Sequence, residues 1–168
     1  LARMGLILEC AMYFHQLPQM ADFAKAIPEL TIVVNHIGGP MLVGPYAGKD
    51  DEVMPAWRRG LAAVAEAPNV VMKLGGVGMP RYGFDWHQRD QPIGSEELAE
   101  SMAPLLNYCI EQFGPSRCMF ESNFPVDKVS FSYHVMYNAF KRLSKGYSAA
   151  ERADMFHDTA VRVYRIEV

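Results

Sequence analysis

The chain has 168 residues, of which 50% are hydrophobic and 21% are charged, and its formal net charge is −3. So high an apolar fraction excludes a disordered chain, and the slightly negative charge argues against nucleic acid as a partner. Because no apolar run approaches the roughly 20 residues that span a bilayer, we also expect no membrane interaction.

Three cysteines, Cys10, Cys109 and Cys118, are spaced without a CxxC pair. This odd number argues against a disulfide framework or a structural zinc knot and fits a reducing compartment. The first residues lack the charged region, long apolar stretch and cleavage site of a signal peptide, so we expect a cytoplasmic protein.

Four short apolar runs predict buried β-strands, because they are rich in aliphatic residues and are bounded by turn residues. They cover residues 5–10, 31–35, 70–74 and 118–121. Between and after them, apolar residues recur at helical spacing, with Pro18 and Pro55 in first turns, Ser95 as an N-cap and a capping box from Ser148 to Glu151. The predicted helices cover residues 18–28, 55–66, 96–113, 132–144 and 149–165.

Strands therefore alternate with helices, and no pair of neighbouring strands is joined by a tight hairpin turn. This order predicts an α/β fold of parallel β/α units, with the strands covered by helices. In such folds functional groups gather at the carboxyl ends of the strands. The polar residues at the ends of the predicted strands or directly after them are His15, Asn35, His36, Lys73, Glu121, Ser122, Asn123 and Asp127.

Each candidate also has a structural interpretation. A histidine after a strand often serves as a hydrogen-bonding or capping residue, and Lys73 is equally well explained as a solvated strand end. The segment GGVG at 75–78 lacks the GK[ST] of a phosphate-binding loop. Trp57 favours packing, whereas Tyr82 and Trp86, in a polar glycine-rich loop, fit packing and pocket equally.

Four separated segments together resemble the amidohydrolase-related (amidohydrolase 2) family of metal-dependent hydrolases, and they occur in the family's order. They are residues 14–40, 55–79, 113–128 and 151–166. The resemblance implies the C-terminal half, strands five to eight, of a TIM barrel. Residues 1–168 would then form a partial domain whose N-terminal half is absent, since a complete barrel needs about 250 residues.

The resemblance also implies site residues. His36, Asn123 and Asp127 would be catalytic, while His15, Lys73, Arg81 and Trp86 would bind substrate. The possible ligands of one divalent metal, zinc or similar, are His15 and His36. Metal dependence is in question because Asn123 stands where many relatives carry Asp, and because the family's strand-one His-x-His pair has no counterpart. Asp127 would reach the site only if the turn at 124–125 folds back.

The leading hypothesis is a hydrolase that opens a small polar cyclic ester or amide, such as a lactone, by His-assisted attack of water. Two alternatives stay open: a non-oxidative decarboxylase of the same superfamily, and a catalytically silent half barrel. An isolated half barrel would expose apolar strand faces and two sheet edges, which predicts a homodimer through those edges. The fragment alone is expected to be inactive.

Overall fold

A computed structural model describes residues 1–167 of the chain. Four parallel strands form one sheet in the order β1-β2-β3-β4, so each strand pairs with its neighbour in sequence. The strands are β1 (Leu8–Cys10), β2 (Ile32–Val34), β3 (Val70–Leu74) and β4 (Cys118–Phe120). This confirms the predicted parallel β/α fold, with strands at most three residues shorter at either end than the apolar runs.

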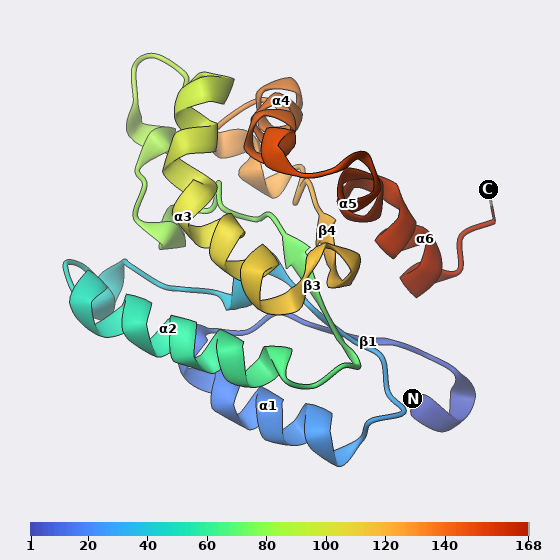
Figure 1. Cartoon of the computed structure of the whole chain (residues 1–168). Coiled ribbons are helices and arrows are strands. Elements are labelled where there is room, and N and C mark those ends of the chain that lie inside the picture. The colour runs from blue at the N-terminus through green and yellow to red at the C-terminus, as the bar shows by residue number, and fades with distance from the viewer. Residues whose placement is uncertain (168) are drawn as a thin grey trace.

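The helices connect and follow the strands, as Figure 1 shows. They are α1 (Leu17–Ala26), α2 (Asp50–Ala65), α3 (Ser95–Phe113), α4 (Tyr133–Leu143), α5 (Ala149–Ala153) and α6 (Thr159–Tyr164). Helix α1 ends before Pro28 because proline restricts Ile27, whose φ of −133° and ψ of 67° are not helical. A π-helical turn at Asp154–Asp158 interrupts the single last helix that the sequence predicted.

Two predicted helix starts are wrong. Helix α2 begins at Asp50, five residues before Pro55, with three acidic residues in its first turn at the positive end of the helix dipole. Pro55 lies inside the helix and removes one backbone donor there. The N-cap of α3 is Gly94 rather than Ser95, whose hydroxyl accepts a hydrogen bond from Arg142 instead. The capping box between Ser148 and Glu151 is confirmed.

Alternate strand residues divide the interior into two parts. Residues such as Val34, Met72 and Leu74 face the main core, to which α1, α2 and α3 contribute their apolar sides. Residues on the other face of the sheet form a second cluster, in which Val33, Val71 and Met119 pack with Val163 of α6. Because each of these strand residues is at most 6% exposed, the expectation that this face is unshielded is wrong.

The two outer strands remain relevant to assembly. Within the described sheet, β1 pairs only with β2, and β4 pairs only with β3. A homodimer through these edges stays a prediction, which sedimentation of the protein would test. None of the helices within residues 1–167 has the length and apolar character needed to cross a membrane.

Candidate active site

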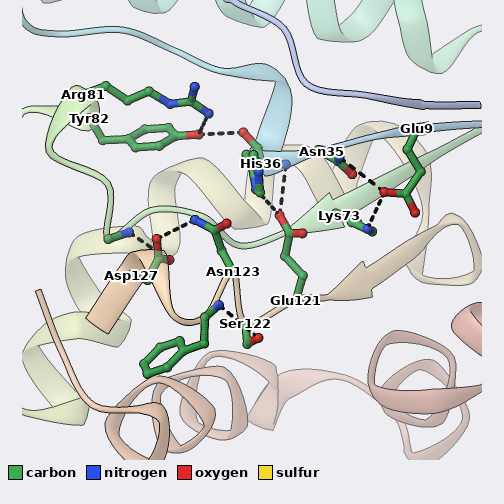
Figure 2. A network of polar contacts seen from close by, with 12 residues as sticks. Glu9, Asn35, His36, Lys73, Arg81, Tyr82, Glu121, Ser122, Asn123 and Asp127 are labelled. Atoms are coloured by element: carbon green, nitrogen blue, oxygen red, sulfur yellow. Dashed lines mark hydrogen bonds and ion pairs between the residues drawn. The ribbon is translucent and has the colours of Figure 1, made fainter. Parts of the chain in front are cut away.

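His36 and Glu121 come together at the carboxyl end of the sheet, although 85 residues separate them in sequence. His36 follows β2 and Glu121 directly follows β4, so their side chains must meet across the end of β3. Nδ1 of His36 lies 2.6 Å from Oε1 of Glu121, and the backbone N–H of His36 donates to the same oxygen at 3.0 Å. Figure 2 shows this pair.

Two glycines after β3 make this contact possible. A Cβ atom on Gly76 would lie 2.5 Å from Nδ1 of His36, and one on Gly75 would lie 2.5 Å from Cγ of Glu121. Gly76 also has a φ of +72°, which side chains rarely adopt. The GGVG segment is therefore explained by the close approach of His36 and Glu121 rather than by phosphate binding.

The backbone at His36 is held in an unusual conformation. His36 and Ile37 have φ angles of 55° and 51°, in the left-handed region that costs non-glycine residues about 1–3 kcal/mol each. Two buried side chains hold the carbonyls of this segment. The hydroxyl of Tyr82 donates to the carbonyl of His36 at 2.7 Å, and Nε1 of Trp57 donates to that of Ile37 at 2.7 Å. The fold thus keeps the imidazole in one position.

The position of the imidazole has a chemical consequence. The carboxylate of Glu121 accepts a hydrogen bond, so a neutral His36 carries its proton on Nδ1 and leaves Nε2 as the basic nitrogen. Both side chains are partly buried, with 17% of His36 and 13% of Glu121 exposed. His36 can therefore accept or deliver a proton through Nε2 while Glu121 orients it.

The turn at residues 124–125 folds back and places Asp127 next to Asn123. Its carboxylate accepts from Nδ2 of Asn123 at 2.7 Å and from the backbone N–H of Gly78 at 3.2 Å. Burial raises the pKa of Asp127 from 3.8 to about 6, while these two hydrogen bonds and the nearby His36 favour the charged form and Glu121 opposes it. Asp127 is therefore mostly ionised at neutral pH but close to titrating.

Arg81 is linked to His36 through Tyr82. The guanidinium of Arg81 donates to the Tyr82 hydroxyl at 3.4 Å and lies 5.6 Å from the ring centre of Tyr13. Its Nε is buried and has no hydrogen-bond partner among the described residues. Arg81 is thus a cation beside the predicted catalytic histidine with a donor still to be satisfied.

Lys73 belongs to a different polar group, on the face of the sheet that is turned away from the main core. Its Nζ lies 3.0 Å from Oε2 of Glu9, which also accepts from Asn35 at 3.4 Å, and the hydroxyl of Tyr164 bonds to the other oxygen of Glu9. Partial burial alone would raise the pKa of Glu9, but the hydrogen bonds from Tyr164, Lys73 and Asn35 and the charge of Lys73 lower it. Figure 2 draws Glu9, Asn35 and Lys73 of this group to one side of the His36–Glu121 pair.

The remaining predicted residues take part in neither the His36–Glu121 pair nor the Asn123–Asp127 pair. The exposed side chain of His15 stacks on Tyr13, with ring centres 6.0 Å apart. Trp86 is buried against Phe84 and Phe131.

A divalent metal ion is implied by the resemblance. Among residues 1–167, no three His, Cys, Asp or Glu side chains gather in an arrangement that could hold a metal ion. Nδ1 of His36 is held by Glu121, which leaves Nε2 as the nitrogen that could ligate an ion, and Asn123 presents its Nδ2 donor to Asp127. The roles proposed below are those of this chain's own residues.

Three residues with roles in this site were outside the predicted set. Glu121 was noted in the sequence only as one of the polar residues at the strand ends and was given no role, although its position directly after a strand is the signal that could have assigned one. Trp57 and Tyr82 support the His36 backbone from α2 and from the loop after β3. Nothing in the sequence marks such contacts, because they join residues that are 20 and 46 positions apart.

Comparisons with known proteins agree with this architecture. The family model described as amidohydrolase matches residues 1–166. An uncharacterised protein of Sinorhizobium fredii is 35% identical over 99% of this chain and 49% of its own length. An L-fucono-1,5-lactonase of Burkholderia multivorans is 28% identical over 95% of this chain and 51% of its own length.

Structural comparison gives the same result. A crystal structure of an amidohydrolase from Burkholderia multivorans with bound zinc has a TM-score of 0.82 and 27% identity, covering 99% of this chain and 55% of that chain. The chain thus spans about half the length of the relatives that it matches. Its four parallel β/α units are those of half a TIM barrel. The chain belongs to the amidohydrolase family.

Proposed function

We propose that the whole protein to which this chain belongs hydrolyses a small cyclic ester, a lactone of a sugar acid being the favoured substrate class. The observation that carries this proposal is the oriented pair of His36 and Glu121 at the carboxyl end of the sheet. The lactonase activity named for the Burkholderia multivorans relative supports the choice of substrate.

Hydrolysis of a lactone needs a proton to leave the attacking water and another to reach the ring oxygen that departs. In our proposal, Nε2 of His36 accepts the first proton and later returns one to the alkoxide, while Glu121 keeps the imidazole in the productive tautomer. General acid–base help of this kind contributes about 10²–10⁴-fold to the rate. Glu121 acts through His36 and is a positioning residue.

Two further groups have proposed roles next to this pair. The side-chain carbonyl oxygen of Asn123 or the carboxylate of Asp127 would hold the attacking water beside Nε2 of His36, and Asp127 is ionised above about pH 6. Arg81, whose Nε is unsatisfied within residues 1–167, would bind a carboxylate or hydroxyl of the substrate. Lys73 is a weaker choice for this task because Glu9 already pairs with it. His15 and Trp86 stay proposed substrate contacts.

The experiment that tests the proposal is a substrate panel on the whole protein. Lactones of several sugar acids, the matching amides and a set of aromatic acids are each incubated with the enzyme, and acid release and CO₂ release are followed. We expect acid release from at least one lactone and no CO₂ from the aromatic acids. Decarboxylation without lactone opening would replace the proposal with the decarboxylase alternative, and no turnover at all would support a silent scaffold.

A further inference from the structure

A hollow of about 280 Å³ lies at the amino end of the sheet, at the edge opposite the candidate active site. Four of its lining residues each directly precede one strand, in the order Ile7, Thr31, Asn69 and Arg117. Because the four strands are parallel, the residues that precede them meet at one edge of the sheet. This amino-end hollow is therefore separate from the groups that follow the strands.

The charge around the amino-end hollow has one sign. Arg117, Arg162 and Arg165 line it, and no Asp or Glu does. Arg162 lies in α6 and Arg165 directly follows that helix. Among the residues that the structure describes, none of these arginines takes part in an ion pair. Three positive charges thus share one concavity without a carboxylate from residues 1–167 to neutralise them.

Arg117 uses its guanidinium to hold the fold. Its Nε donates to the carbonyl of Phe113 at 3.0 Å, and its two terminal nitrogens donate to the carbonyls of Ala67 and Ala65 at 3.0 Å each. These contacts fix the position of the side chain but leave its positive charge in place. Arg117 therefore supplies positive potential rather than donors for a ligand.

Arg162 and Arg165 keep most of their donors. Within residues 1–167 the guanidinium of Arg162 donates to the carbonyl of Ser116, and that of Arg165 donates to the carbonyl of Gly5 at 2.8 Å. A guanidinium carries five N–H donors, so one bond each leaves several on both side chains. The two arginines are thus anchored at one point and still able to bind an anion.

Part of the wall of the amino-end hollow is apolar. Val71 and Val163 line it and are only 6% and 9% exposed, and Ile7 packs against them in the second cluster. Beside buried apolar groups, charges are screened less than they are on an open surface. The concave shape therefore strengthens the attraction of the three arginines for an anion.

We propose that the amino-end hollow binds a phosphate group, a compact oxyanion with up to two negative charges. The forked donors of arginine match phosphate oxygens in both geometry and charge. Arg162 and Arg165 would donate to these oxygens, and Arg117 would add positive potential. The proposal does not rest on lactone hydrolysis, because none of these residues belongs to the candidate active site.

The test is direct binding to the whole protein, measured by isothermal titration with inorganic phosphate, methyl phosphate and acetate. We expect inorganic phosphate to bind at least about tenfold more tightly than acetate, which has one charge, and to bind more weakly as salt rises from about 0.05 to 0.5 M. Tighter binding of methyl phosphate would identify a phosphate ester as the ligand, whereas equal or weaker binding would identify free phosphate. Equal affinities for phosphate and acetate, or no phosphate binding up to about 10 mM, would overturn the proposal.

A matched pair of arginine variants locates the site. Arg162→Gln removes one charge from the amino-end hollow, whereas Arg59→Gln removes an exposed arginine of α2 that does not line it. We expect Arg162→Gln to weaken phosphate binding about three- to tenfold, Arg162→Lys to weaken it less because the charge is kept, and Arg59→Gln to leave it unchanged. Equal phosphate affinities for Arg162→Gln and Arg59→Gln would also overturn the proposal.

Thermal unfolding provides a second measurement on the same variants. Without phosphate it shows that each variant is folded, and with phosphate the midpoint should rise less for Arg162→Gln than for the wild type and Arg59→Gln. If Arg162→Gln does not fold, Arg165→Gln replaces it, since this exposed side chain has its one described hydrogen bond with Gly5. A phosphate-induced rise that is the same in all variants would contradict binding at the amino-end hollow.

Discussion

The buried carboxylate of Asp127 makes a prediction about stability that can be worked out from its surroundings. Burial raises its pKa from 3.8 to about 6, a change of about two units. Each unit corresponds to about 1.4 kcal/mol, so the ionised carboxylate costs the folded state about 3 kcal/mol relative to the protonated one. Because the folded state binds this proton more tightly, the favourable contribution is complete below about pH 3.8 and is lost as the pH rises through about 6.

Asp127→Asn removes this titration while keeping the size of the side chain. An amide has one oxygen where the carboxylate has two, so one of the donors from Asn123 and Gly78 loses its acceptor unless the Asn123 amide turns over. That loss costs about 1–3 kcal/mol at every pH. The informative quantity is therefore the change with pH in the difference between the two unfolding free energies.

Urea unfolding followed by circular dichroism at pH 4, 5, 6, 7 and 8 measures this difference. We expect the variant to gain about 2 kcal/mol relative to the wild type between pH 4 and pH 8, with most of the change between pH 4 and 6. Asp90→Asn, at an exposed acid, is the control and should show no such change. A difference that is constant with pH, or that moves in favour of the wild type, would refute the reasoning.

Three further substitutions test the geometry around His36. Glu121→Ala removes the acceptor of two His36 hydrogen bonds. We expect the kcat of the whole protein to fall about 10–100-fold and ¹⁵N spectra to show mixed imidazole tautomers of His36. An unchanged Nδ1–H signal of His36 would contradict this. Gly76→Ala places Cβ 2.5 Å from Nδ1 and should cost about 1–3 kcal/mol in urea unfolding, unlike Gly146→Ala, where no atom lies within 4 Å. Tyr82→Phe removes one of the two donors to the His36 carbonyl and leaves the N–H of Gly39 as the other, so it should cost about 0.5–1.5 kcal/mol. Equal stability would argue against the anchoring role of Tyr82.

The strands and their order were predictable from the sequence because buried parallel strands have a strong local signal. Continuous β-branched and aliphatic runs, such as residues 70–74, match the observed strands closely. Helix starts were less predictable. Pro55 is a strong signal for a first turn, but in the structure the three acidic residues from Asp50 to Glu52 lie in that turn.

The candidate site was predictable only as far as strand ends reveal it. His36, Asn123 and Asp127 were singled out because they are polar residues after buried strands and lie in the segments that resemble the family. The contact between His36 and Glu121 was not, since it depends on β2 and β4 lying on either side of β3 and on Gly76 leaving space. Lys73 was predicted to bind substrate because it lies near the end of a strand. Side chains alternate between the two faces along β3, and Lys73 therefore lies beside Glu9 on the face turned away from the main core.

The most direct test of the central claim is the turnover of sugar-acid lactones by the whole protein carrying His36→Asn. Asparagine tolerates the left-handed backbone at this position, so the fold is kept while the basic nitrogen is lost. Our account predicts a kcat about 10²–10⁴-fold below the wild type, with His157→Asn, at an exposed histidine, unchanged. A well-folded His36→Asn protein that opens lactones at the wild-type rate would contradict it.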